Sequence, residues 1–296
     1  MHAIGMNPRL SLLMRSLIPV VERCVDLNHI YAETNPWPFL TSLSRRPIVL
    51  TIASEKGEPV PAELDRCKNI VVQTEGMKSR LANAGLNPGK IKVVYPGIDL
   101  SSFSPRSTWK VPRRPRVLFA TFPRTEAELA DRGVLLLLEV AQLYPEIDFT
   151  LVSRPWNSGN TAHVAVKKYA ETRDLSNVTI LEGLQRFMGD IYRKHDFTVI
   201  PYTTPDGGKE CPRSLVEALS CGVPVLISDI APFAPFVEMH NCGRLFSRNP
   251  QSFCIAMQQA LAAYPSLSTN AAQIAAQTFD LRNTIGQYRA IYEALT

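Results

Sequence analysis

The most constraining feature of this 296-residue sequence is the regular alternation of short apolar runs and amphipathic segments in its second half. The apolar runs have the length and β-branched content of buried strands, and the segments between them have helical periodicity. Strands joined by single helices form right-handed crossovers within a parallel, doubly wound sheet. The pattern predicts strands at Arg116–Ala120, Asp148–Val152, Val178–Leu181, Phe197–Ile200 and Pro224–Ser228, and helices at Gly133–Leu143, Thr161–Thr172, Phe187–Lys194, Pro212–Cys221, Pro250–Tyr264 and Leu281–Leu295.

The first hundred residues repeat this rhythm more weakly. They predict a second sheet, with strands at Val25–Ala32, Pro47–Ala53, Asn69–Gln73 and Lys92–Tyr95, and helices at Pro8–Arg23, Pro38–Ser44 and Glu75–Gly85. A chain of this length accommodates two α/β domains of ordinary size.

Composition excludes several classes of protein. Hydrophobic residues make up 45% and charged residues 20% of the chain, which is typical of a folded core. The net charge of +5 favours an anionic ligand or an acidic membrane surface, but no nucleic-acid motif is present, and the basic run 113–116 is interpreted as a solvated linker. No apolar run reaches the roughly 18 residues of a membrane span. The six cysteines form no C-x-x-C pair, which favours buried, reduced thiols in a cytoplasmic protein.

The segment 209–229 is the most informative local motif. It predicts a loop, a helix and a buried strand, with Pro212 in the first helical turn and Ser214 and Glu217 at the spacing of a capping box. A helix that begins at the edge of a parallel sheet presents free N–H groups and a positive dipole end. The segment therefore predicts an anion site, with Glu217 one turn into the helix.

This segment resembles the signature of the retaining, nucleotide-sugar-dependent glycosyltransferases of family 4, which have the GT-B fold. Their pattern is a Glu, seven residues, a second Glu followed by Ala, and a Gly-x-Pro turn. Glu217-Ala218-Leu219 and Gly222-Val223-Pro224 match the second half. The first Glu of the pattern would fall on Lys209, and the nearest carboxylate is Glu210. Two alternatives are open: either Glu210 serves in a shorter loop, or the first carboxylate is lost.

The resemblance implies an α/β, GT-B-like fold with two Rossmann-like parallel-sheet domains, of which the N-terminal one is truncated. The expected divisions are an acceptor-side domain at residues 1–100, a linker at 101–115 and a donor domain at 116–280, with the helix of 281–296 packing back on the first domain. A naturally short form and a fragment are both compatible with the sequence.

The resemblance also implies roles for particular residues. Arg124 and Arg132 would bind the donor diphosphate, with Arg132-Gly133 at the position of the family's Lys-Gly. Glu210 would contact the transferred sugar. Two guanidinium groups would stabilise the charge that grows on a leaving diphosphate. The nucleotide would be bound by Gly183, Ser214, Leu215 and Glu217, with Glu217 holding the ribose hydroxyls. Each residue also has an ordinary structural interpretation, such as a solvated loop arginine, a tight turn or a helix cap.

The expected function is the transfer of a sugar from a nucleoside diphosphate sugar to the hydroxyl of an unknown acceptor, with no metal and no cofactor. An alternative is a non-catalytic subunit that binds the nucleotide sugar. It is motivated by Lys209 and by the strand Pro47–Ala53, which lacks the strand-end His that the family often has. His29 is interpreted as a core or edge residue. An epimerase or a phosphorylase is a third reading. The cytoplasmic chain could also rest on a membrane through Leu10–Leu17.

Overall fold

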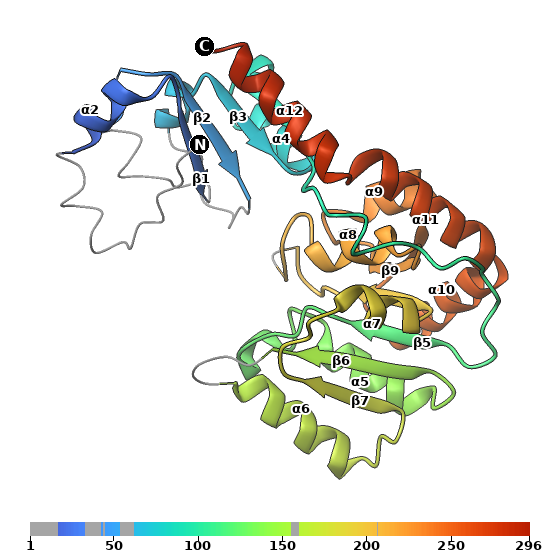
Figure 1. Ribbon diagram of the computed structural model, residues 1–296. Coiled ribbons are helices and arrows are strands. Elements are labelled where there is room, and N and C mark those ends of the chain that lie inside the picture. Colours follow the sequence, from blue (N-terminus) through green and yellow to red (C-terminus); the bar gives the residue numbers. More distant parts are fainter. Residues whose placement is uncertain (1–16, 33–42, 44, 54–61, 155–159, 206) are drawn as a thin grey trace. The chain divides into compact units, whose positions relative to one another are not determined.

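The computed structural model describes residues 17–32, 43, 45–53, 62–154, 160–205 and 207–296 (Figure 1). Its contacts divide the chain into two units, Met1–Tyr95 with Ile285–Thr296, and Pro96–Thr284. We call them unit 1 and unit 2. The predicted helix Pro38–Ser44 and the first half of Pro8–Arg23 fall largely outside the described residues.

Unit 1 contains a sheet of four parallel strands that follow one another in sequence order. The strands are β1 (Asn28–Ala32), β2 (Ile48–Ile52), β3 (Asn69–Val72) and β4 (Ile91–Val93). Helix α4 (Glu75–Asn83) connects β3 to β4, and the Thr74 side chain caps it by accepting the Met77 N–H at 3.0 Å. Shorter helices are α2 (Ile18–Val21), η1 (Glu22–Cys24), η2 (Ala62–Arg66) and η3 (Pro88–Lys90).

The end of the chain completes unit 1. Helix α12 (Leu281–Glu293) begins at the boundary between the units, and the apolar side chains Tyr288, Ile291, Tyr292 and Leu295 pack on Val49, Val71 and Val94 of the sheet. The same face carries a chain of hydrogen bonds: Tyr292 Oη lies 2.7 Å from His29 Nδ1, His29 Nε2 lies 2.8 Å from Thr51 Oγ1, and Thr51 Oγ1 lies 2.9 Å from Tyr288 Oη. His29 is therefore a structural residue of unit 1, as interpreted from the sequence.

Unit 2 contains a sheet of six parallel strands. The strands are β5 (Arg116–Phe119), β6 (Asp148–Ser153), β7 (Val178–Glu182), β8 (Phe197–Ile200), β9 (Val225–Ser228) and β10 (Gly243–Phe246). Their spatial order is β10-β9-β8-β5-β6-β7, so the chain first builds one half of the sheet and then returns past β5 to build the other. This is the order of a classical Rossmann sheet, and it confirms the predicted parallel α/β fold class.

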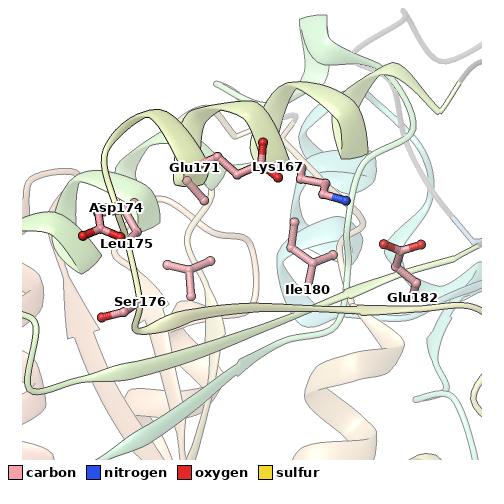
Figure 2. A pocket seen from close by; sticks show the side chains of 9 residues that line it. Lys167, Glu171, Asp174, Leu175, Ser176, Ile180 and Glu182 are labelled. Atoms are coloured by element: carbon pink, nitrogen blue, oxygen red, sulfur yellow. The ribbon is translucent and has the colours of Figure 1, made fainter.

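Helices connect these strands, and α10 (Pro250–Ala262) and α11 (Tyr264–Thr278) follow the last of them. The connecting helices are η4 (Glu126–Glu128), α5 (Val134–Leu143), α6 (Thr161–Thr172), α7 (Met188–Lys194), α8 (Arg213–Ser220) and α9 (Ala234–Met239). A pocket of about 330 Å³ lies between α6 and the edge strand β7, with Leu175 and Ile180 in its lining and Lys167, Glu171 and Glu182 around it (Figure 2).

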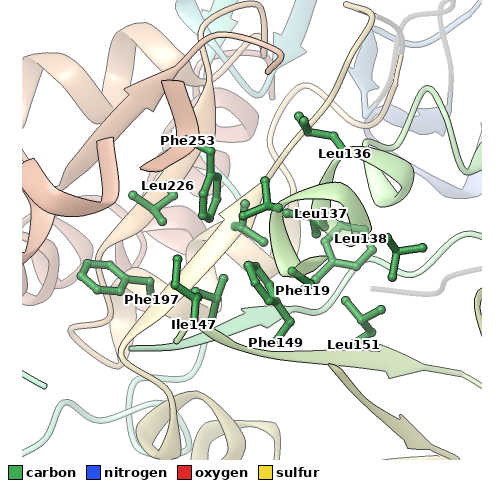
Figure 3. Close-up of a cluster of buried hydrophobic side chains, with 14 of the residues drawn as sticks. Phe119, Leu136, Leu137, Leu138, Ile147, Phe149, Leu151, Phe197, Leu226 and Phe253 are labelled. Atoms are coloured by element: carbon green, nitrogen blue, oxygen red, sulfur yellow. The ribbon is translucent and has the colours of Figure 1, made fainter. Parts of the chain in front are cut away.

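The core of unit 2 forms where α5 and α10 cover the middle of the sheet. Phe119 and Phe149 from the strands, Leu137 and Leu138 from α5, and Phe253 from α10 converge in one buried cluster (Figure 3). The apolar runs that predicted β5, β8 and β9 are buried throughout or nearly so, as expected for central parallel strands.

Three elements of unit 2 were missing from the sequence prediction: α9, β10 and α11. Strand β10 is short and only half buried in its middle, so its apolar signal is weak. The predicted helix Pro250–Tyr264 corresponds to α10, and no helix was predicted over α11. Pro265 instead lies in the first turn of a separate helix whose Ser, Thr, Asn and Ala residues carry little apolar periodicity.

The segment 101–115 has contacts with unit 2. Trp109 packs against the core cluster, and the Arg106 Nη1 atom lies 3.6 Å from the carboxylate of Asp196. Of the six free cysteines, Cys24 is exposed and Cys254 half-buried, which corrects the prediction of buried thiols at these two positions, while the other four are buried. In the part of the chain that the structure describes, no helix is long and apolar enough to span a bilayer.

Candidate functional site

The order of the strands in unit 2 creates one position where neighbouring connections diverge. Successive helices leave β5 and β8 in opposite directions along the sheet, so the loops after these strands, 120–133 and 201–212, lie next to each other at the carboxyl edge. Ligands of open α/β sheets bind at such a switch point. We call this region the β5–β8 edge.

The two loops of the β5–β8 edge are joined directly. Thr203 donates its N–H to the Asp131 carbonyl at 3.0 Å and its hydroxyl to the Ala130 carbonyl at 2.7 Å. Gly133 has φ +74°, and a Cβ placed there would lie 1.7 Å from the Pro201 carbonyl oxygen. A Cβ at Gly207 would lie 2.2 Å from the Asp131 carbonyl oxygen. Both glycines are therefore required by the close approach of the two backbones.

Arg132 is held in this junction. Its N–H donates to the Glu128 carbonyl at 3.0 Å, and its guanidinium carbon lies 6.0 Å from the centre of the Tyr202 ring. Tyr202 is buried directly after β8, and burial raises the pKa of its phenol to about 12 against the opposing effect of the Arg132 charge. Arg132 thus brings a half-buried positive charge to the loop that leads to Glu210.

Arg124 lies on the other arm of the same loop, and its side chain is exposed. Its N–H donates to Glu128 Oε2 at 3.0 Å, and the Thr125 N–H donates to the same oxygen at 3.2 Å. Through its side chain and its carbonyl, Glu128 therefore ties the backbones of Arg124 and Arg132 to one turn.

Lys209 and Glu210, the two candidates for the position of the first Glu of the family pattern, have opposite environments. Lys209 is exposed, whereas only 7% of Glu210 is exposed. Glu210 directly precedes Cys211 and Pro212, which are also buried ahead of α8. The buried side chain in this loop is therefore a carboxylate, and the lysine points to solvent.

The start of α8 corrects the predicted capping box. Pro212, with extended backbone, is the N-cap, the helix begins at Arg213, and no side chain caps it. Ser214 is therefore inside the helix, where its hydroxyl is buried without a hydrogen-bond partner among the described residues. The Leu215 N–H donates to the Pro212 carbonyl at 3.0 Å. The polar donor at this helix end is therefore Ser214 rather than Leu215.

Glu217 has side-chain partners instead of a capping role. Tyr192 of α7 donates its hydroxyl to Glu217 Oε2 at 2.9 Å, and Arg213 donates from Nε to Oε1 at 3.2 Å. Burial raises the pKa of Glu217, while the bonds from Tyr192 and Arg213 act to lower it. A carboxylate held in this way retains lone pairs that can accept hydrogen bonds from hydroxyl groups.

Buried polar atoms without partners among the described residues are frequent at the carboxyl ends of the unit 2 strands. Thr121 Oγ1 follows β5, Ser228 Oγ ends β9, Asn160 Oδ1 precedes α6, and Ser214 Oγ lies at the start of α8. Each such atom costs about 1–3 kcal/mol when it is left unpaired in a dry interior. Their concentration at one edge indicates a surface that binds a polar ligand or ordered water.

Gly183 is the predicted residue that lies apart from this group. It forms the turn after β7 with φ +91°, and its N–H donates to the Ser153 carbonyl at 3.1 Å. β7 is separated from β8 by β5 and β6. Three strand spacings of about 4.8 Å place their axes roughly 14 Å apart. The pocket of Figure 2 lies beside β7 and is lined by none of the predicted site residues.

Sequence reasoning missed Tyr202 and Tyr192. The position of Tyr202, two residues after a predicted strand at the switch point, was an available signal. Tyr192 gave no signal, because a tyrosine inside an amphipathic helix is typical of ordinary core packing. Among the described residues, no group of three or more His, Cys, Asp or Glu side chains is placed to hold a metal ion.

Most of unit 2 is similar to a known family. Residues 119–263 match the family model described as glycosyl transferases group 1, in agreement with the glycosyltransferase resemblance of the sequence. A D-inositol 3-phosphate glycosyltransferase of Mycolicibacterium gilvum is 26% identical over 236 residues, covering 75% of this chain and 51% of the relative. One of Rhodococcus jostii is 25% identical, covering 73% and 49%. The chain thus spans about half the length of the curated relatives that it matches.

Solved structures show the same fold. A glycosyltransferase from Rickettsia africae has a TM-score of 0.78 at 15% identity, covering all of this chain and 84% of that one. Anabaena HepE in complex with UDP-glucose has a TM-score of 0.77 at 19% identity, covering 99% and 86%. Sucrose-phosphate synthase from Thermosynechococcus elongatus has a TM-score of 0.77 at 16% identity, covering 99% and 80%. The two parallel-sheet domains therefore have the GT-B fold.

Proposed function

We propose that this chain is a retaining glycosyltransferase that moves a sugar from a nucleoside diphosphate sugar to an acceptor hydroxyl. The observation that carries the proposal is the β5–β8 edge. Arg132 and the buried carboxylate of Glu210 come from two loops that are bonded to each other, and the buried hydroxyl of Ser214, which has no partner among the described residues, lies in the first turn of the helix that follows. The family match covers this edge, and HepE, whose fold this chain shares, was solved with UDP-glucose.

The diphosphate would bind between Arg132 and the start of α8. The N–H and hydroxyl of Ser214 and the positive end of the helix dipole would donate to phosphate oxygens. Arg132 and Arg124 would neutralise the charge that grows on the diphosphate as the glycosidic bond breaks, which lowers the energy of the transition state. Arg132 is the better placed of the two, because Tyr202 supports its guanidinium group.

The nucleoside and the sugar would lie to either side of the diphosphate. Glu217 would accept hydrogen bonds from the ribose hydroxyls, and the turn at Gly183 would present backbone atoms to the base. Glu210 would accept hydrogen bonds from hydroxyls of the transferred sugar, where a carboxylate also stabilises an oxocarbenium-like transition state. The burial of Glu210 and the exposure of Lys209 favour this assignment over loss of the first carboxylate.

The proposal is tested by offering UDP-, GDP- and ADP-linked hexoses to the purified chain and measuring its melting temperature and the release of nucleoside diphosphate. We expect one donor to stabilise the chain and to be turned over. Both effects should be lost in Arg132→Ala and in Glu217→Ala. Arg173→Ala is the matched control, because Arg173 stacks on Tyr169 beyond the end of α6, away from the β5–β8 edge.

Two outcomes would contradict the proposal. Stabilisation by a donor without any release, with several sugar and polyol acceptors present, would indicate a non-catalytic subunit that binds nucleotide sugars. No stabilisation by any donor would contradict nucleotide-sugar binding altogether. For an active chain, the anomeric configuration of the product, measured by NMR, decides between retention and inversion.

A further inference from the structure

Tyr192 is a buried side chain whose only polar atom is directed at the candidate site. Its relative exposure is 0%, and its hydroxyl donates to Glu217 Oε2 at 2.9 Å. A carboxylate can only accept, so the phenol must be the donor. Burial, followed by the negative charge of Glu217, raises the pKa of Tyr192 well above its ordinary value. The phenol therefore keeps its proton, and Tyr192 is the donor of this hydrogen bond whenever Glu217 is ionised.

The helix that carries Tyr192 is fixed in place. Arg193 of α7 donates from Nη1 to the Ser104 carbonyl at 3.0 Å. At Gly189 the helix approaches the Ser102 carbonyl so closely that a Cβ would lie 2.3 Å from its oxygen. The Tyr192 ring packs against Phe103, with the ring centres 6.4 Å apart. The segment 102–104 thus holds α7 in place, so the Tyr192 hydroxyl keeps a fixed position even when the Glu217 side chain moves.

The other partner of Glu217 is of a different kind. Arg213 lies one turn before Glu217 on the same helix, and 74% of its side chain is exposed. A pair with one solvated partner contributes little to stability and does not hold a side chain firmly, because the exposed guanidinium group exchanges its hydrogen bonds with water. Of the two oxygens of Glu217, one is therefore held by a rigid buried donor and the other by a mobile surface donor.

From this contrast we infer that Tyr192 is a positioning residue: its buried hydroxyl holds the carboxylate of Glu217 in the orientation in which the remaining lone pairs accept the ribose hydroxyls of the donor. The inference rests on the proposed function and adds to it a residue that touches neither nucleotide nor sugar. Preorganisation of this kind improves binding because the ligand does not have to order the side chain that receives it.

The experiment is Tyr192→Phe, which removes one oxygen atom and retains the ring against Phe103. The dissociation constants of UDP, GDP and ADP are measured by calorimetry across pH, beside those of Glu217→Ala. Loss of a hydrogen bond to a charged group corresponds to a roughly 10-fold or greater increase in the dissociation constant of the preferred nucleotide. The hydrogen bond from Tyr192 lowers the pKa of Glu217, so its loss in the variant should raise that pKa. As pH falls, nucleotide binding to the variant should therefore begin to weaken at a higher pH than binding to the unsubstituted chain.

Tyr264→Phe is the matched control. Tyr264 is also fully buried in unit 2, but its hydroxyl interacts with Ser268 and not with Glu217, so we expect unchanged affinity and an unchanged pH profile. The pH profile separates positioning from a merely structural role. A general loosening of the fold would expose Glu217 and lower its pKa, whereas loss of the hydrogen bond from Tyr192 alone raises it.

The possible results separate failure of the inference from failure of the proposed function. If Glu217→Ala weakens nucleotide binding and Tyr192→Phe leaves both the affinity and the pH profile unchanged, the inference is wrong and the proposed function stands. If neither variant changes binding, or if the unchanged chain binds none of the three nucleotides, the assigned role of Glu217 is wrong, and the inference falls with it.

Discussion

The two units are built from the same kind of parallel sheet, but they differ in where buried polar side chains lack hydrogen-bond partners. In unit 1 the strands follow in sequence order, and Glu22, Thr51 and Gln73 all have hydrogen-bond partners. In unit 2 the strand order reverses at β5 and β8. Among the described residues, buried side-chain oxygens without a partner, such as Thr121 Oγ1, Ser214 Oγ and Ser228 Oγ, belong to this unit.

This difference distinguishes polar groups that stabilise the fold from polar groups that are available to a ligand. A hydrogen-bond network that is complete within the protein contributes to its folding, whereas an unpaired buried group costs stability until a ligand or water completes it. In unit 1, Thr51 and His29 join the sheet to α12 through hydrogen bonds. In unit 2, polar atoms such as Ser214 Oγ and Ser228 Oγ are left without partners among the described residues at the carboxyl edge of the sheet. The following predictions test this contrast, in order of decreasing expected effect.

Gly133→Ala should have the largest effect. The new Cβ would overlap the Pro201 carbonyl, and φ +74° is strained for alanine. Backbone strain and overpacking each cost about 1–3 kcal/mol, so we expect the free energy of unfolding to fall by roughly 2–6 kcal/mol. Chemical denaturation measures this loss, and calorimetry with UDP, GDP and ADP should show reduced nucleotide binding, because the β5–β8 edge is disrupted.

Gly286→Ala is the control for this substitution in unit 1. Gly286 lies on α12, and no atom would lie within 4 Å of its Cβ. A glycine-to-alanine change inside a helix should stabilise by about 0.5–1 kcal/mol. Equal effects of the two substitutions would contradict the close approach of the loops at Gly133.

Thr51→Val should test whether the polar network of unit 1 is structural. The substitution retains the shape of the side chain but leaves both His29 Nε2 and the Tyr288 hydroxyl without their shared partner. Two such losses correspond to about 2–4 kcal/mol of unfolding free energy. Nucleotide affinity should not change. Thr179→Val, at an exposed position of β7, should change stability by less than about 0.5 kcal/mol.

Ser214→Ala should have the opposite effect to Thr51→Val: it should change nucleotide affinity and not lower stability. The hydroxyl makes no hydrogen bond in the free chain, so its removal should leave the stability unchanged or raise it by up to about 1 kcal/mol. Nucleotide affinity should fall by roughly 2- to 10-fold, the equivalent of one hydrogen bond. Thermal denaturation with and without nucleotide measures both effects.

Ser220→Ala is the control on the same helix. Its buried hydroxyl donates to the Val216 carbonyl at 2.8 Å, so its loss should lower stability by about 1 kcal/mol without affecting nucleotide binding. A loss of stability in Ser214→Ala as large as that in Ser220→Ala would break the proposed distinction between paired and unpaired hydroxyls.

The smallest effect is a pH dependence of stability that both units share. Burial lowers the pKa of His29 in unit 1 and of His195 in unit 2, so each folded unit favours the neutral imidazole. Their contribution is complete above the ordinary pKa of about 6.5 and is lost as pH falls from there through the lowered pKa. Each histidine contributes a slope of at most about 1.4 kcal/mol per pH unit.

Denaturation curves between pH 5 and pH 8 measure this slope. In His29→Gln the slope should decrease but persist, because His195 still titrates. A slope that disappears completely in this variant would show that His195 does not contribute, and an unchanged slope would show that His29 does not.

Much of this protein was determined by its sequence alone. The apolar runs and helical periods located β5, β6, β8 and β9 to within one residue, because burial in a parallel sheet imposes a pattern on contiguous residues. The alternation of strands and helices predicted the parallel sheets, and the motif around Glu217 pointed to the edge of the sheet that carries Arg132 and Glu210. Local spacing was misleading at Ser214 and Glu217, where it predicted a capping box.

The tertiary structure alone decided which groups face one another. Glu217 is paired with Tyr192 rather than with the helix end, Arg132 lies over Tyr202, and Glu210 is buried while its neighbour Lys209 is exposed. In the two pairs the partner comes from a different element, 25 residues away in one case. Periodicity records whether a position is buried. It does not record what lies opposite, because that depends on how separate elements pack.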